Sequence, residues 1–330
     1  MKILVLGGAG YIGSHFVKTA IQKKNEVFVV DNLQTGHLEA LDKKAKFFKG
    51  DIRDKLFMAD VFEKCSIDVC VHFAANSLVG VSMEKPNEYF DNNVYGTIVL
   101  LEMMQKFNVK KIVFSSSAAV YGTHIDMPIT EEYATLPTNP YGESKLMMEN
   151  MMKWADQAYG IKYVSLRYFN VAGASKDATI GEDHNPETHL IPLVLQVPLE
   201  NSDSITIFGN DYDTLDGTCI RDYIHIADLV DAHLKAIDYL FHHNDSNVFN
   251  LGSEIGYSNL EIVKVARDVT KHPIPMKIGG RRMGDPAKLV ASYQKAKRIL
   301  DWMPKRGIGE IISSAWAFHQ SHPYGYKEEK

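Results

Sequence analysis

The sequence predicts an α/β protein in which a doubly wound parallel sheet is followed by a smaller, mixed α/β region. Three observations predict this fold. Short apolar segments alternate with longer segments of helical spacing, the first apolar segment ends in a run of glycines, and the pattern becomes irregular after Asn170. Strands that are apolar on both faces and alternate with helices are typical of a parallel sheet covered by helices on both sides.

The strands of the predicted sheet are short apolar runs at residues 2–6, 26–31, 46–51, 69–74, 111–115 and 163–169. Apolar residues with helical spacing lie between them, most clearly at residues 11–23, 87–107 and 141–159. This alternation is the reason for predicting a parallel sheet.

The second half of the chain is less regular. Residues 172–192 are rich in Gly, Asp, Asn and Pro, which predicts a loop. Further strands are expected at 205–208 and 248–252, and further helices at 228–240, 259–269 and 293–300. We therefore predict a first domain at residues 1–170, completed by a segment near 220–252, and a smaller second domain at residues 171–330.

The composition excludes several classes of protein. Of 330 residues, 45% are hydrophobic and 23% charged, which is ordinary for a globular chain and excludes intrinsic disorder and disulfide scaffolds. The formal charge of −5 gives no general attraction to nucleic acid or anionic membrane.

Three cysteines, at positions 65, 70 and 219, are an odd and sparse set that favours a reducing compartment. No apolar run approaches the roughly 20 residues of a membrane span, so we expect a cytoplasmic protein.

The glycine-rich turn predicts a dinucleotide site. Gly7, Gly10, Tyr11, Ile12 and Gly13 connect the first strand to the first helix. Glycines let the backbone approach a pyrophosphate, and the helix N-terminus offers unpaired N–H groups, as in a Rossmann-like fold.

Two acidic positions extend this site. Asp31 ends the second strand, where a carboxylate can bind the ribose hydroxyls and repel a 2′-phosphate, so NAD is favoured over NADP. Asp51 and Ile52 follow the third strand and either contact adenine or, in the case of Asp51, cap a helix.

A Tyr and a Lys at helical spacing predict a catalytic pair. Tyr141 and Lys145 are four residues apart, which places both side chains on one face of a helix. A tyrosine has a pKa near 10, and to act as a base near neutral pH it must be shifted down by about three units. A neighbouring lysine stabilises the phenolate. Ser115, Ser116 and Ser117 lie at the end of the fifth strand, where a hydroxyl could reach a substrate oxygen. The alternative is an ordinary solvated helix face.

Six motifs in order make the chain resemble a known family. GGAGYIG, HFAA, FSSSAAVYG, YGESK, LRYFN and RDYIH match the extended short-chain dehydrogenase/reductases, over residues 1 to about 325. The resemblance is strongest to the members that epimerise UDP-hexoses at C4. It implies an isomerase of galactose metabolism that interconverts UDP-galactose and UDP-glucose through a transient 4-keto sugar and tightly bound NAD.

The resemblance also implies residue roles. Tyr141 would be the base and acid, Lys145 would tune it and bind nicotinamide ribose, and Ser117 would hydrogen-bond the reacting hydroxyl. NAD would contact Gly7, Gly10, Tyr11, Ile12, Gly13, Asp31, Asn32, Asp51, Ile52, Phe73, Ala74, Ala75, Asn92, Ser115, Tyr141, Lys145 and Tyr168. The UDP-sugar would contact Ser117, Tyr141, Asn170, His189, Leu190, Phe208, Arg221, Tyr223, Arg282, Asp285 and Leu289.

Three positions depart from the family pattern or leave it open. Ser77 replaces a common lysine near the NAD diphosphate, and His189 replaces a common asparagine near the substrate diphosphate. Leu289 flanks the sugar 2-substituent, and a leucine there leaves the use of UDP-N-acetylhexosamines open.

Competing functions differ in what they require. A 4,6-dehydratase needs an Asp-Glu pair, and a UDP-glucuronate decarboxylase needs an acid, where this chain has Ala118 and Ala119. Epimerisation of another nucleotide sugar, such as a UDP-uronate, stays open. A non-catalytic NAD-sensing protein of the same fold typically lacks the Tyr/Lys pair.

No metal site is predicted. Cys65 and Cys70 lack partners at zinc-ligand spacing, and His242 and His243 are interpreted as part of a solvated loop. The family resemblance further implies a homodimer formed by the methionine-rich helices predicted at 87–107 and 141–159.

Overall fold

The computed structural model describes residues 1–124, 126–282 and 285–326. Its centre is a seven-stranded sheet in the order β3-β2-β1-β4-β5-β6-β10, and every pair of neighbours in it is parallel. The strands are β1 (Lys2–Leu6), β2 (Glu26–Asp31), β3 (Lys46–Lys49), β4 (Val69–His72), β5 (Lys111–Ser117), β6 (Lys162–Tyr168) and β10 (Asn247–Leu251). This is the predicted doubly wound, Rossmann-like α/β fold.

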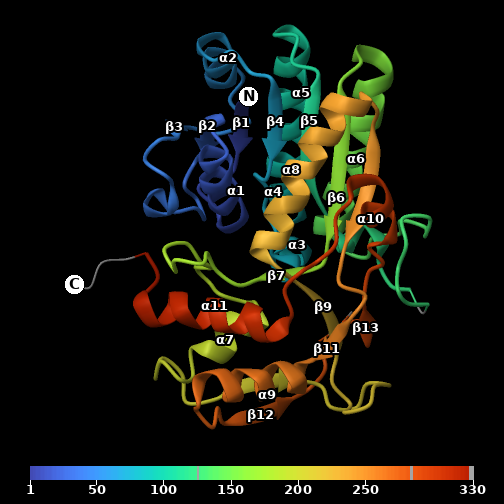
Figure 1. Cartoon of the computed structure of the whole chain (residues 1–330). Coiled ribbons are helices and arrows are strands. Elements are labelled where there is room, and N and C mark those ends of the chain that lie inside the picture. The colour runs from blue at the N-terminus through green and yellow to red at the C-terminus, as the bar shows by residue number, and fades with distance from the viewer. Residues whose placement is uncertain (125, 283–284, 327–330) are drawn as a thin grey trace.

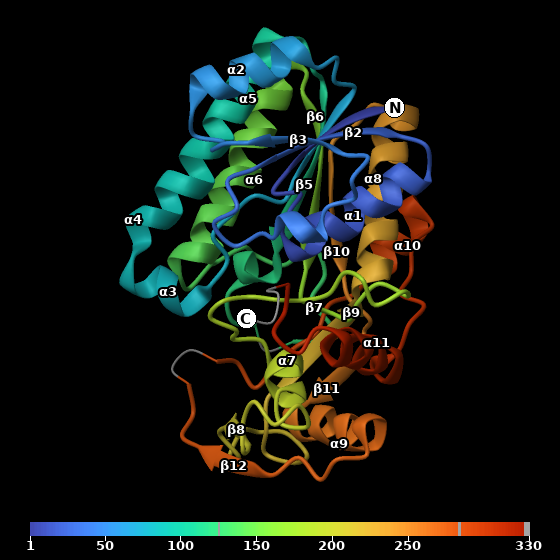
Figure 2. The ribbon, with the colours of Figure 1, turned by 90° about the vertical axis from the view of Figure 1, so that its left-hand side faces the viewer.

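Helices cover both faces of this sheet (Figures 1 and 2). One face carries α1 (Tyr11–Gln22), α8 (Ile226–His243) and α10 (Gln294–Leu300), and the other carries α2 (Lys55–Lys64), α5 (Gly96–Lys106) and α6 (Pro140–Tyr159). Each face has its own buried apolar cluster. The shorter elements on the second side are α3 (Val79–Glu84), α4 (Pro86–Tyr89) and the π-helical turn η2 (Phe90–Tyr95), and two short 3₁₀ turns are η1 (Leu38–Ala40) and η3 (Ala118–Tyr121).

The remaining elements pack together beyond the carboxyl ends of the parallel strands (Figure 1). Their strands are β7 (Asn170–Ala172), β8 (Ile205–Phe208), β9 (Ile220–His225), β11 (Gly256–Ser258), β12 (Met276–Gly279) and β13 (Lys288–Leu289). Their helices are α7 (Leu190–Leu195), α9 (Asn259–Thr270) and α11 (Ile308–Ser321). In the small sheet, β9 is the strand that pairs with β7, β11 and β13. A third buried apolar cluster includes residues of this part of the chain. Residues 283, 284 and 327–330 of the predicted second domain lie outside the described residues.

Local sequence signals set the ends of α6, the helix of the YGESK motif. Asn139 caps its N-terminus by accepting a hydrogen bond from the Gly142 N–H, and Pro140 occupies the first turn. Gly160 ends the helix in the left-handed conformation. The start of α6, and therefore the direction in which its first turn points, is fixed by the sequence.

Several expectations about elements are corrected by the structure. The helix expected at residues 87–107 is interrupted by the π-helical turn η2, and α2, α7 and α11 were not predicted. His242 and His243 form the last turn of α8 and not a loop. Asp51 is not the cap of a helix, because Asp54 caps α2 by accepting from two backbone N–H groups.

A buried ion pair ties α6 to the sheet. Two guanidinium nitrogens of Arg167 on β6 donate to the two carboxylate oxygens of Glu149 on α6, at 2.9 and 2.5 Å, and both side chains are less than a tenth exposed. Ser116 on β5 also donates to Glu149, and Arg167 donates to the Tyr121 hydroxyl, which in turn donates to Asn250 on β10. One network therefore joins α6 to three strands.

Arg167→Met removes one partner of this pair and leaves a carboxylate buried without its counter-charge. Loss of one partner from a buried pair destabilises by about 3–5 kcal/mol, so we expect the free energy of unfolding in urea to fall by that amount. The matched control is Lys64→Met, which breaks the exposed Lys64–Asp60 pair and should change stability by less than about 1 kcal/mol. Equal effects of the two substitutions would contradict the role assigned to the network.

Candidate active site

A cavity of about 450 Å³ lies where the parallel strands end and the smaller sheet begins. Its walls come from the turn after β1, the ends of β2 and β6, the start of α6, and the loop before α7. The strand order reverses between β1 and β4, and in doubly wound sheets ligands bind at this switch point.

The glycine turn is packed too tightly for side chains at two positions. Gly7 has a φ of +76°, and a Cβ on it would lie 2.5 Å from the backbone nitrogen of Ala74. A Cβ on Gly13 would lie 2.1 Å from the Gly7 carbonyl oxygen. Gly10 differs, because a Cβ there would meet only the Gly7 oxygen at 3.5 Å. The open space over Gly10 faces the cavity, as a bound pyrophosphate requires.

Asp31 is held at the end of β2 by the backbone. Its two carboxylate oxygens accept hydrogen bonds from the N–H groups of Ala9 and Leu33, at 2.9 and 2.8 Å. Burial raises the pKa of Asp31, and these two hydrogen bonds oppose that rise. The carboxylate is fixed beside the glycine turn and lines the cavity, so its free lone pairs can accept from ribose hydroxyls.

Asp51 forms an ion pair with a neighbouring arginine. Its carboxylate accepts from the Arg53 guanidinium at 2.9 and 2.7 Å, and the Arg53 side chain is the main reason that the pKa of Asp51 is lowered to about 2. Asp51 does not line the cavity, whereas Ile52 and Asn32 do.

Tyr141 and Lys145 lie on the first turns of α6, with the Lys145 Nζ 5.9 Å from the centre of the Tyr141 ring. Burial lowers the pKa of Lys145 to about 7. Burial also raises the pKa of Tyr141, and a hydrogen bond with Ser117 opposes that rise. The phenol therefore gains acidity from Ser117 and from any positive charge brought next to it.

The three serines that end β5 point in three directions. Ser115 lies within 3.2 Å of a His233 ring nitrogen, and its carbonyl oxygen accepts from the Lys145 Nζ at 3.0 Å. Ser116 donates to Glu149. Ser117 alone of the three lines the cavity. Ser115 thus supports Lys145 through its carbonyl oxygen, and it is not among the residues that line the cavity.

The far side of the cavity carries arginines. Arg221 on β9 donates to the Pro286 carbonyl oxygen at 2.8 Å and lies 3.5 Å from the Asp285 carboxylate. The Arg282 guanidinium lies 4.1 Å from the centre of the Phe208 ring. Arg221, Asp285, Arg282 and Phe208 line a second cavity of about 180 Å³, and the first two of them also line the first cavity.

Nearly all of the predicted site residues line one of these two cavities. The first contains Gly7, Gly10, Tyr11, Ile12, Gly13, Asp31, Asn32, Ile52, Phe73, Ala74, Ala75, Asn92, Ser117, Tyr141, Lys145, Tyr168, Asn170, His189, Arg221, Asp285 and Leu289, and Ser77 is there too. The second adds Leu190, Phe208, Tyr223 and Arg282.

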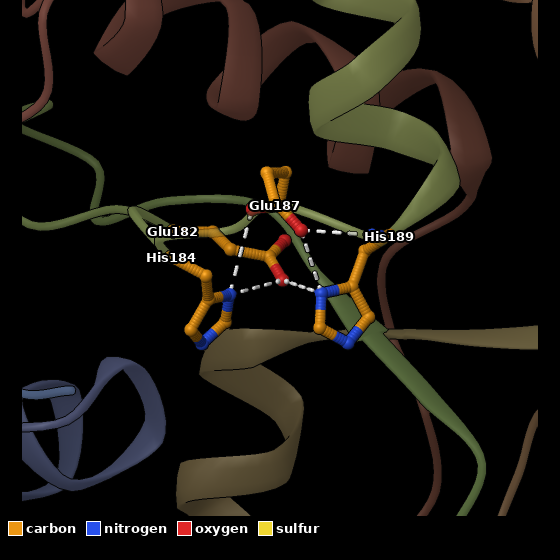
Figure 3. Close-up of side chains that lie close together, drawn as sticks. All are labelled: Glu182, His184, Glu187 and His189. Carbon is orange, nitrogen blue, oxygen red and sulfur yellow. Dashed lines mark hydrogen bonds and ion pairs between the residues drawn. The ribbon is translucent and has the colours of Figure 1, made fainter. Parts of the chain in front are cut away.

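Sequence analysis missed a cluster at the junction of the two cavities. Glu182, His184, Glu187 and His189 come from the loop between β7 and α7 and turn their charged ends toward one another (Figure 3). Burial opposes the charge on both imidazoles, but the two carboxylates outweigh it and raise the pKa of His184 to about 9 and of His189 to about 10. The spacing E-x-H-x-x-E-x-H in the sequence was the available signal.

Comparisons with known proteins agree with this architecture. The model of the NAD dependent epimerase/dehydratase family matches residues 3–252. The UDP-glucose 4-epimerase of Streptococcus mutans serotype c is 57% identical, with 99% of each chain covered. A crystal structure of a UDP-glucose 4-epimerase has a TM-score of 0.97 at 54% identity, over 99% of this chain and 100% of that one. The Bifidobacterium longum enzyme, solved with NAD⁺ and UDP, has a TM-score of 0.94 at 40% identity, over 99% and 100%.

The chain belongs to the NAD-dependent epimerase/dehydratase family. It is an NAD-dependent isomerase. Among the described residues, no helix is both long enough and apolar enough for a bilayer crossing.

Gly10→Ala should weaken NAD binding and leave the stability of the fold nearly unchanged. The extended backbone of Gly10 (φ −73°, ψ 170°) accepts alanine, and the chain leaves room for the methyl group. The methyl group would occupy the space that a pyrophosphate needs, so we expect NAD affinity to fall at least about tenfold, equal to about 1.4 kcal/mol. Stability should change by less than about 0.5 kcal/mol.

The readouts are NAD content of the purified protein, NAD titration and urea unfolding. Gly80→Ala is the matched control, since a Cβ there meets nothing within 4 Å, and it should keep the affinity of the unaltered chain. Unchanged NAD affinity in Gly10→Ala would contradict the position assigned to the pyrophosphate.

Proposed function

We propose that this chain interconverts UDP-galactose and UDP-glucose by epimerisation at C4. The observation that carries the proposal is that Tyr141 and Ser117 line one cavity together with the glycine turn and Arg221, and that Arg221 also lines the second cavity. A nucleotide sugar can then be held at its diphosphate while its sugar ring reaches the phenol. The full-length similarity to enzymes named UDP-glucose 4-epimerase supports this choice of substrate.

The residues of the chain divide the work. Tyr141 removes the proton from the sugar 4-hydroxyl and returns it to the oxygen of the 4-keto sugar, while Ser117 hydrogen-bonds the same oxygen. NAD, when bound in the cavity, would supply the hydride acceptor and donor for C4. Lys145 supplies positive charge behind the phenol, which favours the phenolate. These roles require the sugar to turn between the two transfers.

Anchoring away from C4 makes that turn possible. Arg221 and Arg282 are permanently charged and offer forked donors suited to a diphosphate. Phe208, beside Arg282, offers a flat apolar face to the uracil. Ala118 and Ala119, which follow Ser117, provide no carboxylate for the elimination of water, and this favours epimerisation over dehydration.

The proposed NAD-binding domain is completed by a later segment of the chain. We propose that residues 1–170 and the segment near 220–252 bind NAD, and that residues 171–330 bind the UDP-sugar. The strands β6 and β10 pair side by side in the large sheet, and β9 belongs to the smaller sheet. We further propose that the protein acts in the cytoplasm.

The direct test is proton NMR of UDP-galactose incubated with the purified protein without added NAD. We expect UDP-glucose to appear until a fixed equilibrium mixture is reached, because NAD is regenerated in each cycle and remains bound. Tyr141→Phe should lower turnover by about 10²–10⁴-fold, the contribution of a general acid–base group, and should leave NAD bound. Tyr159→Phe, at the exposed end of the same helix, should keep full turnover.

Two results would decide against the proposal. Absence of conversion by the unaltered chain, even with NAD added, would reject this substrate. Full activity of Tyr141→Phe would reject the catalytic role of the phenol.

We also propose that the protein is a homodimer formed by α5 and α6. Both helices, with the π-helical turn before α5, expose large apolar side chains, namely Tyr95, Ile98, Met147 and Trp154. Exposed apolar groups on neighbouring helices are typical of an interface.

Sedimentation equilibrium should give twice the chain mass of 37.1 kDa. Met147→Glu should shift the equilibrium toward monomer, since it places a charge among these apolar groups. Leu56→Glu, at an exposed position on α2, is the control and should remain dimeric. A monomeric parent protein would contradict the interface.

A further inference from the structure

Four potential metal ligands converge in the loop between β7 and α7. Figure 3 shows Glu182, His184, Glu187 and His189 with their carboxylate oxygens and Nδ1 atoms facing a common centre. These ligand atoms all lie within 4.8 Å of one another. The four residues span only eight positions, so the loop needs no distant element to assemble them.

The distances between the ligand atoms suit one small cation. The Nδ1 of His184 lies 3.4 Å from a Glu182 oxygen and 3.5 Å from a Glu187 oxygen. The Nδ1 of His189 lies 3.0 and 2.8 Å from oxygens of the same two carboxylates. Ligands at 2.0–2.2 Å from a tetrahedral zinc ion are about 3.4 Å apart.

One atom of the cluster is poorly hydrogen-bonded. The Nδ1 of His184 is buried, and its only polar contacts among the described residues are the long ion pairs with Glu182 and Glu187 at 3.4 and 3.5 Å, neither of which is a hydrogen bond. A buried polar atom without a partner costs free energy, and such atoms are rare in folded proteins. The atom is aimed at the centre of the cluster (Figure 3), where a cation would satisfy it.

The two buried carboxylates of the cluster also favour a bound cation. The side chains of Glu182 and Glu187 are only 5% and 8% exposed, and buried carboxylates need compensating positive charge. A divalent cation at the centre of the cluster would supply two positive charges to these carboxylates.

We propose that these four residues bind one divalent transition-metal ion, with zinc as the best match. Two imidazole nitrogens and two carboxylate oxygens in a tetrahedral arrangement are ligands that zinc takes in proteins. Magnesium and calcium prefer six or more oxygen ligands and fit this set poorly.

The surrounding structure holds the loop in place for such an ion. The Tyr326 hydroxyl accepts from the Gly181 N–H at 3.0 Å, and the Tyr326 N–H donates to Asp183 at 2.9 Å. At the other end, the backbone N–H groups of Thr188 and His189 donate to a Glu187 oxygen at 2.7 and 2.8 Å. Contacts with Tyr326 therefore hold the loop at Gly181 and Asp183, and hydrogen bonds within the loop orient the Glu187 carboxylate.

The location gives the ion a structural effect on the site. Glu182 and His189 line both cavities, beside Arg221. An ion at the cluster centre would fix this shared wall and not occupy the cavities themselves. The inference rests on the geometry of the loop and stands or falls independently of the proposed substrate.

The test measures metal in the complete protein, purified without a histidine tag. The protein is stripped with a chelator, dialysed against micromolar Zn²⁺ and analysed by mass spectrometry for zinc per chain. We expect about one zinc per chain, a higher melting temperature with zinc than without it, and visible absorption of tetrahedral Co²⁺ when cobalt replaces zinc.

Variants assign the ion to these residues. His184→Gln and Glu187→Gln should each lose the stoichiometric zinc and the cobalt absorption. His242→Ala/His243→Ala removes two exposed histidines from the end of α8 and should keep both. No zinc above the background of the control, or equal zinc in all variants, would overturn the proposal and leave a cluster paired by imidazole protons alone. Loss of folding in one variant does not obscure the result, because the cobalt spectrum of the parent protein tests the geometry by itself.

Discussion

The position of α6, the helix that carries Tyr141 and Lys145, depends on the buried ion pair between Glu149 and Arg167. Glu149 lies four residues after Lys145 on α6, so the pair fixes the helix one turn from the lysine. The same guanidinium contacts Tyr121, and the same carboxylate contacts Ser116, so the end of β5 is fixed with it. A buried pair of this kind defines one arrangement of its surroundings, because any other arrangement leaves a charge without a partner.

The end of β5 connects the ion pair between Glu149 and Arg167 to the cavity. Side chains along a strand alternate between its faces, and the three serines use this alternation together with the turn that follows. Ser115 supports Lys145 through its carbonyl oxygen, Ser116 joins the ion-pair network, and Ser117 lines the cavity beside Tyr141. One short segment thus connects the rigid core to the reacting group.

Burial alone favours the uncharged forms of Tyr141 and Lys145. It raises the pKa of Tyr141 and lowers that of Lys145 to about 7. The hydrogen bond from Ser117 lowers the pKa of Tyr141, and a positive charge near the phenol would lower it further. The acidity of the Tyr141 phenol therefore depends on what lies beside it in the cavity.

The sequence by itself determined the parallel sheet, the glycine turn and the Tyr141–Lys145 spacing, because strand alternation, helix periodicity and turn chemistry are local properties. Local patterns did not predict three features of the structure. These are the pairing of β9 with β7, the π-helical turn before Gly96, and the ion pair between Asp51 and Arg53. Those features depend on contacts between residues far apart in the chain or on competition among neighbouring groups. The Glu182–His189 cluster combines both cases. Its spacing was visible in the sequence, but only the fold of the loop brings the four ligands to one point.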